Sequence, residues 1–188
     1  MRPPFGNFTA VSAALDVCGQ LAAPVADALK NWEPREVAES VLYVDTDPDK
    51  ADTAVFSAAY QVPLDVSANC VVVAVKRAGE TALAACLALA GTRVDVNSVV
   101  RKHLGARKAS FAPMDTAVGA SGMEYGGITP VGLPVSWPLL VDAAVVTRPH
   151  VLVGSGSRRG KLILPGRVLA LLPGAEVIEG LALDPASR

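Results

Sequence analysis

The sequence predicts a single α/β domain with a mixed, mostly antiparallel central sheet of about six or seven strands and helices packed around it. Its 188 residues are 51% hydrophobic and 19% charged, which is typical of a folded domain that has its own core. Aromatic residues make up only 5%, so the core must be built from Val, Leu and Ala. This composition favours strands packed under helices.

The first third of the chain is predicted to be mainly helical. Residues 9–32 carry hydrophobic side chains at roughly helical spacing, and Pro24 should kink or divide this helix. A short strand is expected at 41–44. A second helix is expected over 47–60, because Pro48 suits a first helical position.

The middle of the chain is predicted to contain a β-hairpin. The valine-rich run 70–75 suits a buried strand, and 82–89 follows it after a turn at Gly79. Ala and Leu also favour helix, but the turn makes a strand the preferred interpretation of 82–89. A helix started by Asp95 is expected over 96–104. Shorter elements are predicted as strands at 109–111, 140–146, 151–153, 161–164 and 176–180, and as helical turns at 113–118 and 169–172.

No repeat or linker divides the chain. We expect residues 1–40 to form a helical extension packed on the domain, 41–183 to form the domain, and 184–188 to form a tail. Residues 119–138 contain five glycines and three prolines. A long loop of this kind inside a compact domain is usually functional or mobile.

Hydropathy and cysteine usage indicate a cytoplasmic protein. The longest apolar runs are about ten residues, against roughly 20 for a membrane-spanning helix, which predicts no membrane partner. The N-terminus lacks the basic start and apolar run of a signal peptide. Cys18, Cys70 and Cys86 have neither zinc-ligand spacing nor the pairing of a disulfide framework, so we expect no metal site.

Charge is distributed unevenly along the chain. Residues 1–92 carry six basic and eleven acidic side chains, whereas 93–167 carry ten basic and four acidic ones. The basic residues cluster as Arg101-Lys102, Arg107-Lys108 and Arg158-Arg159-Gly160-Lys161. Local positive charge is what contact with a phosphate backbone needs, and solvated surface is the alternative interpretation.

Two glycine-rich loops could carry binding chemistry. In the run from Tyr125 to Gly132, paired glycines let the backbone approach a ligand and a proline stiffens the exit. The run from Gly154 to Ser157 adds serine hydroxyls. The second run does not match a Walker loop, a nucleotide fingerprint or an esterase elbow, and ordinary tight turns are the alternative for both runs.

A third candidate is the entrance to the valine-rich strand, where a polar pair can face a pocket. Cys70 is the only thiol placed in this way. No motif pairs it with His103 or His150, and a buried cysteine is usually inert packing. The sequence is compatible with two interpretations of Cys70, a nucleophile and a packing residue.

Taken in order, these pieces resemble the YbaK/prolyl-tRNA synthetase associated domain family, over about residues 41–183. The run from Ser121 to Gly132 is similar to the family's TG…GG[VI][ST]P[FVI]G loop, and Gly154-Ser155-Gly156 resembles its second loop. Members remove wrongly attached amino acids from tRNA. The resemblance therefore implies hydrolysis of mischarged aminoacyl-tRNA without metal or nucleotide cofactor, with the acceptor end as partner and neither DNA nor membrane.

The resemblance also implies roles for individual residues. It places Asn69, Gly126 and Ser155 in catalysis, and it places Gly127, Ile128, Thr129, Pro130, Gly154, Gly156 and Cys70 in substrate binding. We expect the charges of Arg158, Arg159 and Lys161 to hold the tRNA. These assignments, together with the resemblance, make aminoacyl-tRNA deacylase the leading functional hypothesis.

One departure from the family pattern matters. The family usually has a lysine at the entrance of its first long strand, and Asn69 occupies that place here. Asparagine can donate a hydrogen bond to a carbonyl oxygen but brings no positive charge. The alternatives to the deacylase are therefore an aminoacyl-tRNA binding module that has lost catalysis and a thiol hydrolase that uses Cys70.

Overall fold

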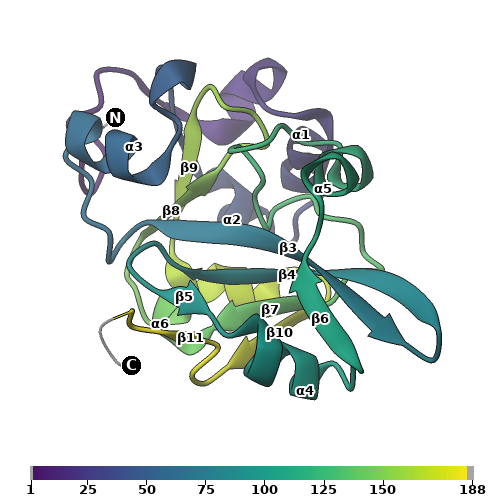
Figure 1. Cartoon of the computed structure of the whole chain (residues 1–188). Coiled ribbons are helices and arrows are strands. Elements are labelled where there is room, and N and C mark those ends of the chain that lie inside the picture. Colours follow the sequence, from purple (N-terminus) through teal and green to yellow (C-terminus); the bar gives the residue numbers. More distant parts are fainter. Residues whose placement is uncertain (1, 186–188) are drawn as a thin grey trace.

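In the computed structural model, which describes residues 2–185, two β-sheets share one hydrophobic core and helices cover their outer faces (Figure 1). The larger sheet has the strand order β10 (Ala175–Ile178), β7 (Leu139–Asp142), β4 (Glu80–Leu89), β3 (Ala68–Arg77) and β6 (Lys108–Phe111). Its β3, β4 and β6 are antiparallel, and β7 runs parallel to both β4 and β10. The predicted hairpin is confirmed, and the segment 82–89 is a strand.

The smaller main sheet is antiparallel throughout. Its order is β1 (Val11–Ala13), β2 (Leu42–Val44), β9 (Lys161–Leu164) and β8 (Val151–Gly154). A separate pair joins β11 (Ala182–Leu183) to β5 (Arg93–Val94). Ser67 and Leu152 form a parallel bridge, and the Leu152 N–H donates to the Val66 carbonyl at 2.8 Å. The start of β3 is thereby fixed against β8, and this is the place where the two main sheets meet.

Helical segments are short and lie mostly between strands. They are η1 (Ala14–Gln20), α1 (Ala23–Lys30), α2 (Arg35–Glu39), η2 (Pro48–Lys50), α3 (Thr53–Tyr60), η3 (Val96–Val100), α4 (Arg101–His103), α5 (Met114–Ser121), α6 (Ala143–Val146) and η4 (Gly166–Leu171). Within residues 2–185, no helix combines the length and the apolar character needed to cross a membrane.

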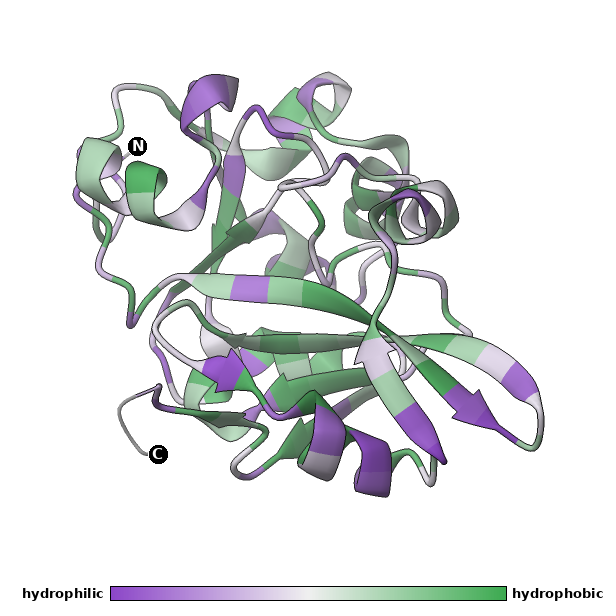
Figure 2. Cartoon of the chain, viewed as in Figure 1, coloured by the Kyte–Doolittle hydropathy of each residue, from purple (hydrophilic) through white to green (hydrophobic). Residues whose placement is uncertain are grey.

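Strand alternation divides the core into three clusters. On β3, Val72 faces the core between the sheets, whereas Val73 faces the cluster under η3 and α4. On β9, Leu162 and Leu164 face the central core, and Ile163 faces α3. Figure 2 shows the hydrophobic residues gathered in the middle of the strands and hydrophilic ones at the outer end of the β3–β4 hairpin.

The predicted α/β class is confirmed, with the strands distributed over two main sheets and a separate pair instead of one central sheet. The predicted helix over 9–32 is wrong in its first half. Residues 11–13 form a strand paired with β2, η1 follows, and Pro24 lies in the first turn of α1 instead of kinking a longer helix. Propensity there is overridden by pairing with the sheet edge. Residues 14–38 contribute to the central core. Of the tail predicted at 184–188, residues 186–188 lie outside the described residues.

Two other boundaries differ from expectation for reasons of capping. The predicted helix over 47–60 is split, because Asp47 caps the single turn η2 through Asp49 N–H and α3 begins only at Thr53. The predicted strand 140–146 ends at Asp142, whose carboxylate accepts from Ala144 N–H and starts α6.

Candidate active site

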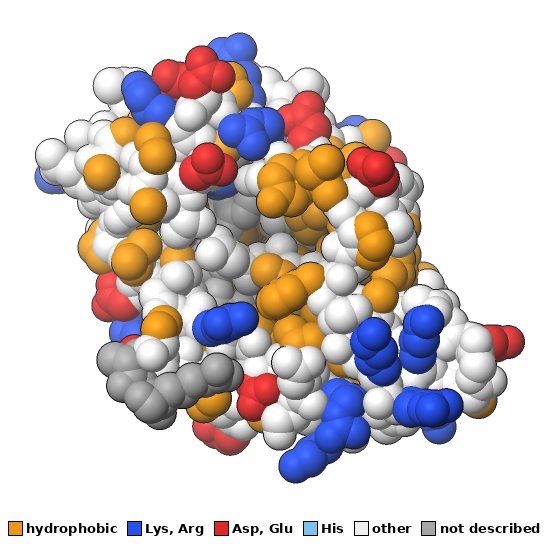
Figure 3. All heavy atoms as spheres, viewed as in Figure 1, with side chains coloured by type: hydrophobic (Ala, Val, Ile, Leu, Met, Phe, Trp, Pro, Cys, Tyr) orange, Lys and Arg blue, Asp and Glu red, His pale blue; other side chains and the backbone are white. Residues whose placement is uncertain are grey.

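A cavity of about 490 Å³ opens where the two sheets meet. Figure 3 shows it as a hollow in the middle of the face, with hydrophobic side chains around it. The start of β3, helices α3 and α5, the loop after α5, and the facing ends of β8 and β9 form its walls. Polar or backbone groups reach it from Thr53, Asn69, Gly126, Gly154 and Lys161.

The structure brings together part of the predicted site. The sequence-predicted residues that line the cavity are Asn69, Cys70, Gly126, Ile128, Gly154 and Lys161. Those that lie behind its wall or outside it are Gly127, Thr129, Pro130, Ser155, Gly156, Arg158 and Arg159. The division follows from which face of each loop is turned toward the hollow.

Asn69 lies near the start of β3, and its side chain is exposed to the cavity. The Thr53 hydroxyl donates to Asn69 Oδ1 at 3.3 Å. Among the described residues this is the only hydrogen bond of the Asn69 side chain, so its amide nitrogen is left to donate to a ligand.

The two glycine-rich loops pack directly on each other. The Gly156 N–H donates to the Gly127 carbonyl at 2.9 Å, and the Gly127 N–H donates to the Glu124 carbonyl at 3.0 Å. A Cβ on Gly154 would lie 2.3 Å from the Gly127 oxygen, and one on Gly127 would lie 2.4 Å from the Ser157 backbone. These glycines are needed for close backbone packing, and the amides of Gly127 and Gly156 are already used within the protein.

Ser155 has a different task from the one predicted. Its side chain is fully buried and does not line the cavity. Its hydroxyl donates to the Gly160 carbonyl at 3.0 Å, which holds the turn between β8 and β9 in shape. The catalytic hydrogen bond predicted for Ser155 is therefore not available to a ligand in this arrangement, because the oxygen faces into its own loop.

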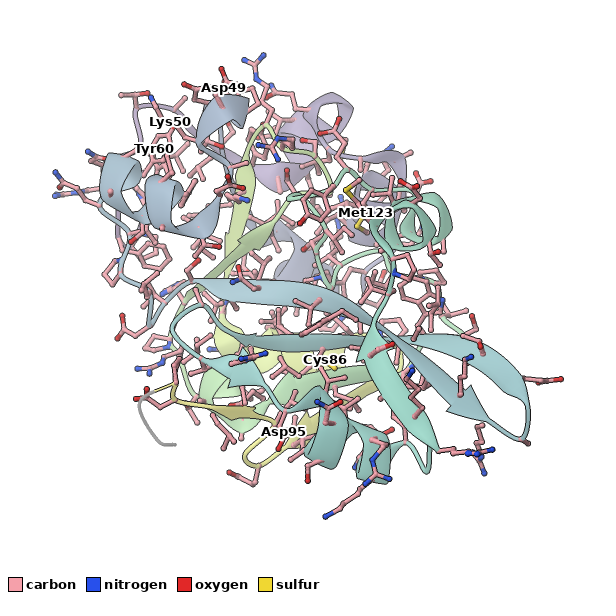
Figure 4. All side chains as sticks on the ribbon, in the orientation of Figure 1. Asp49, Lys50, Tyr60, Cys86, Asp95 and Met123 are labelled. Carbon is pink, nitrogen blue, oxygen red and sulfur yellow. The ribbon has the colours of Figure 1, made fainter. Side chains whose placement is uncertain are left out.

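Cys70 lines the cavity, but its thiol is poorly suited to nucleophilic attack. Burial, and next the nearby Cys86, raise the pKa of the Cys70 thiol well above its ordinary range. Cys86, labelled in Figure 4, lies on the neighbouring strand β4. Neither histidine lines the cavity, and His103 is within 2.9 Å of the Glu176 carboxylate elsewhere. A thiolate at Cys70 lacks the electropositive surroundings that activated cysteines have.

Lys161 is the unexpected group of the site. It begins β9 and is only 7% exposed. Its Nζ donates to the Gly126 carbonyl at 3.3 Å and lies 5.5 Å from the centre of the Phe56 ring. Burial, and next the charge of Arg158, lower the pKa of Lys161 to about 8, while Asp52 acts in the opposite direction. In the sequence this lysine belongs to a basic cluster that was expected at the surface. Residues two apart in a strand share a face, so the hydrophobic Ile163 could have indicated that the Lys161 side chain also points inward.

The other two members of that cluster are already engaged. Arg159 binds both carboxylate oxygens of Asp45, at 2.8 and 2.9 Å, and this hydrogen bonding lowers the pKa of Asp45. The Arg158 guanidinium donates to the Pro48 carbonyl at 3.0 Å, and its backbone N–H donates to Glu124 Oε2 at 2.7 Å. Arg158 therefore joins the segment before α3 to the loop that follows α5. Asp49 and Lys50, labelled in Figure 4, belong to that segment, and Tyr60, also labelled, ends α3.

Sequence reasoning missed most of the apolar lining. Phe56 lies one turn after Thr53 on α3, so both reach the cavity from one helix face. Phe111, Met114 and Tyr125 line the cavity too, and their exposed fractions are 52%, 53% and 60%. Three exposed large side chains at one opening form an apolar rim. The spacing on α3 was a usable signal, but the meeting of α3, β6 and α5 depends on tertiary packing.

Within residues 2–185, no three His, Cys, Asp or Glu side chains gather closely enough to hold a metal ion. The polar groups that face the cavity are instead an amide, hydroxyls, an ammonium, the single carboxylate of Asp52 and backbone atoms. Such groups can orient a carbonyl compound and stabilise negative charge on its oxygen.

The fold and the cavity define a small α/β protein with a preformed pocket between two sheets. A family model described as "Aminoacyl-tRNA editing domain" matches residues 47–171, and the chain belongs to this family. The resemblance found in the sequence is thereby confirmed. No curated protein matches the chain.

Solved structures share the fold. One described as a "putative trans-editing enzyme for prolyl tRNA synthetase" is 18% identical and superimposes with a TM-score of 0.70 over 84% of this chain and 94% of that one. Another, the "hypothetical protein APE2540", is 22% identical with a TM-score of 0.70 over 83% of this chain and 99% of that one. At these identities the likeness establishes the fold alone.

The buried charge of Lys161 predicts a pH-dependent effect on stability. Its folded pKa of about 8 is below the value of about 10.4 for an unfolded lysine, so holding the ammonium form in the folded state at pH 7 costs about 3 kcal/mol relative to the neutral amine, with its charged neighbours included. Lys161→Met should therefore raise the free energy of unfolding at pH 7 by on the order of 1–3 kcal/mol. Between about pH 8 and 10.4 the unfolded wild type holds a proton that the folded form has released, so its stability rises there and the gain should shrink.

Urea denaturation of wild type and variant at pH 7 and pH 10 measures this difference. Lys30→Met, at an exposed lysine of α1, is the matched control and should change stability little at either pH. A Lys161→Met protein that is less stable than wild type at pH 7 would contradict the burial argument.

Proposed function

We propose that the protein hydrolyses the ester bond of a mischarged aminoacyl-tRNA in this cavity, without a metal or nucleotide cofactor. The observation that carries the proposal is the meeting of Asn69, Gly126 and Gly154 around one hollow. These residues come from the three segments that the family resemblance singles out. A volume of about 490 Å³ is within the usual range of sites for small ligands.

The chemistry of the walls suits the end of an aminoacyl-tRNA. Val72, Ala117, Ile128 and Val153 provide an apolar inner surface for the amino acid. Unpaired bases at the end of an RNA strand stack on exposed aromatic side chains, and the apolar rim defined above provides Phe111 and Tyr125. The terminal adenosine would therefore lie at the rim, with the ester bond directed inward.

Asn69 is the residue that would orient the ester. Thr53 holds its side-chain oxygen, which leaves the amide nitrogen to donate to the ester carbonyl. The Gly126 N–H makes no hydrogen bond within the described residues, so it can be a second donor. A water molecule attacks the carbonyl carbon, and the substrate's own ribose hydroxyl assists, because Ser155 and Cys70 are not available as activated groups.

No activated serine or thiol lines the cavity among the described residues, and this also supports the second candidate, a binding module. In that case the same cavity holds an aminoacyl-tRNA and releases it unchanged. The two candidates differ only in turnover. Deacylation of a panel of mischarged tRNAs by the purified protein therefore tests the proposal, which predicts hydrolysis of at least one member above background. Several members bound and none hydrolysed would establish the binding module instead.

Asn69→Ala should lower turnover on the tRNA found in this way by one to three orders of magnitude, the range for a lost transition-state donor. The Michaelis constant should change less, because the lost bond strengthens mainly in the transition state. Asn97→Ala, at an exposed asparagine that does not line the cavity, is the matched control. Circular dichroism and thermal melting establish that each variant is folded. An active Asn69→Ala together with an inactive, folded Cys70→Ala would favour the thiol hydrolase.

The tRNA stem needs a positive surface beyond the rim. Lys76, Arg77, Arg107 and Lys108 are all exposed where β6 meets the β3–β4 hairpin, and we call them the hairpin cluster. Lys76 and Lys108 are direct cross-strand neighbours, and like charges in that position are unfavourable without an anion nearby. No side chain of the cluster forms an ion pair with a described residue. Figure 3 shows Lys and Arg side chains gathered in this region, below and beside the hollow.

Phe111 ends the strand that carries Lys108, so β6 connects the hairpin cluster to the rim. Replacing Lys76 and Lys108 with Ala should weaken tRNA binding. It should also reduce the slope of log affinity against log salt by about 0.9 for each lost phosphate contact. Arg159→Ala should reduce the slope less, because Asp45 already neutralises that charge. If Arg159→Ala reduced the slope more than the replacement of Lys76 and Lys108, the stem would lie over Arg158 and Arg159 instead. Filter binding at several salt concentrations measures the affinity and the slope.

A further inference from the structure

The ammonium of Lys161 is a group in the cavity to which the reaction above assigns no role. A side chain that is 7% exposed normally carries no charge unless an acid is paired with it. Within residues 2–185, no carboxylate forms an ion pair with Lys161. Its hydrogen bond to the Gly126 carbonyl and its position beside the Phe56 ring stabilise the cation without neutralising it.

The charged groups around Lys161 are few. Asp52 is exposed and lines the same cavity, and it favours the ammonium form, whereas Arg158 opposes it. The strand neighbours are uncharged, since Lys161 lies beside Val44 of β2 and Gly154 of β8. From α3 it is approached by the Phe56 ring. A nearly buried cation that faces a cavity and has no paired acid suits a ligand atom that carries or develops negative charge.

We propose that Lys161 is a catalytic residue of the ester hydrolysis, whose ammonium donates a hydrogen bond to the carbonyl oxygen of the bound aminoacyl ester. The inference rests on the proposed function. An ammonium has three donor hydrogens, and the Gly126 carbonyl accepts one of them. The other two remain for a ligand in the cavity.

The step balances as an ordinary hydrolysis. The water oxygen forms a bond to the carbonyl carbon, and the C=O π electrons move to the oxygen, which becomes an oxyanion beside the ammonium. When the oxyanion collapses, the bond from carbon to the ribose oxygen breaks. One proton of the water goes to that ribose oxygen, and the other goes to solvent as the amino acid leaves as a carboxylate.

In this assignment, two strands each supply one hydrogen-bond donor to the carbonyl oxygen. Asn69 on β3 supplies an oriented donor without charge, and Lys161 on β9 supplies charge in the same cavity. The positive group that the family usually has at the position of Asn69 is then provided from a different strand. In a cavity of low dielectric, a charge close to the oxyanion is worth more than it is in water.

Two variants separate charge from support of the Gly126 loop. Lys161→Met removes the charge and the donor, and Lys161→Gln keeps a donor for the Gly126 carbonyl but has no charge. Both should lower kcat/KM on the mischarged tRNA by about 10²–10³, mainly through kcat, whereas Lys30→Met should not change it. Wild-type kcat/KM, after subtraction of uncatalysed hydrolysis, should fall as pH rises past about 8, and this fall should be absent from Lys161→Gln.

Binding of two stable adenosine analogues gives a readout that does not need turnover. One carries an aminoacyl amide in place of the ester, and the other carries an anionic aminoalkylphosphonate that resembles the tetrahedral oxyanion. Wild type should bind the phosphonate at least 100-fold more tightly than the amide, and this preference should be lost in Lys161→Met. Isothermal titration calorimetry measures both affinities.

Several outcomes would overturn the assignment. A folded Lys161→Met with wild-type turnover would do so while leaving the proposed function intact. Loss of turnover in Lys161→Met but full turnover in Lys161→Gln would reduce Lys161 to a positioning residue for Gly126. A wild-type protein that hydrolyses no mischarged tRNA and binds neither analogue would overturn the proposed function and this assignment together.

Discussion

The close contact between the loop after α5 and the turn between β8 and β9 is the constraint on which the site depends. The Gly127 carbonyl accepts from the Gly156 N–H at 2.9 Å, and the space beside Gly154 is too small for any side chain because the Gly127 oxygen would lie 2.3 Å from its Cβ. This contact brings Gly126 beside Lys161, which holds its carbonyl. Arg158 then joins the same loop to the segment before α3. The part of the cavity wall that these two loops form is therefore built mainly from backbone, which is a rigid way to place donors around a ligand.

The turn between β8 and β9 and the start of β9 carry three positive charges that have different roles. Lys161 points into the cavity, Arg158 connects two loops, and Arg159 is paired with Asp45 at the surface. None of the three is an unpaired, freely exposed charge of the kind that a phosphate backbone attracts. The hairpin cluster has that character, and β6 connects it to the apolar rim. An aminoacyl-tRNA bound in this way would have its stem over the hairpin cluster, its last base at the rim and its ester near Lys161.

Much of this arrangement could be predicted from the sequence, and the remainder could not for identifiable reasons. The β3–β4 hairpin, the capping by Asp95 and the two glycine loops are local signals, because turn and cap chemistry depends on neighbouring residues. The strand at 11–13 was predicted as helix because its pairing with β2, some thirty residues away, leaves no local pattern. Ser155 and Lys161 were assigned by their place in a motif. Only the direction of each side chain, set by tertiary packing, showed that one faces its own loop and the other faces the cavity.

We propose that an aminoacyl ester is hydrolysed in the cavity between the two sheets. A crystal structure of the protein with the aminoacyl-amide analogue of adenosine would show where such a group binds. We expect the adenine against Tyr125 or Phe111, the amino acid against Ile128, and the carbonyl oxygen within hydrogen-bond distance of Asn69 Nδ2 or Lys161 Nζ. An analogue bound outside the cavity, or bound inside it with its carbonyl directed away from both residues, would contradict the proposed function.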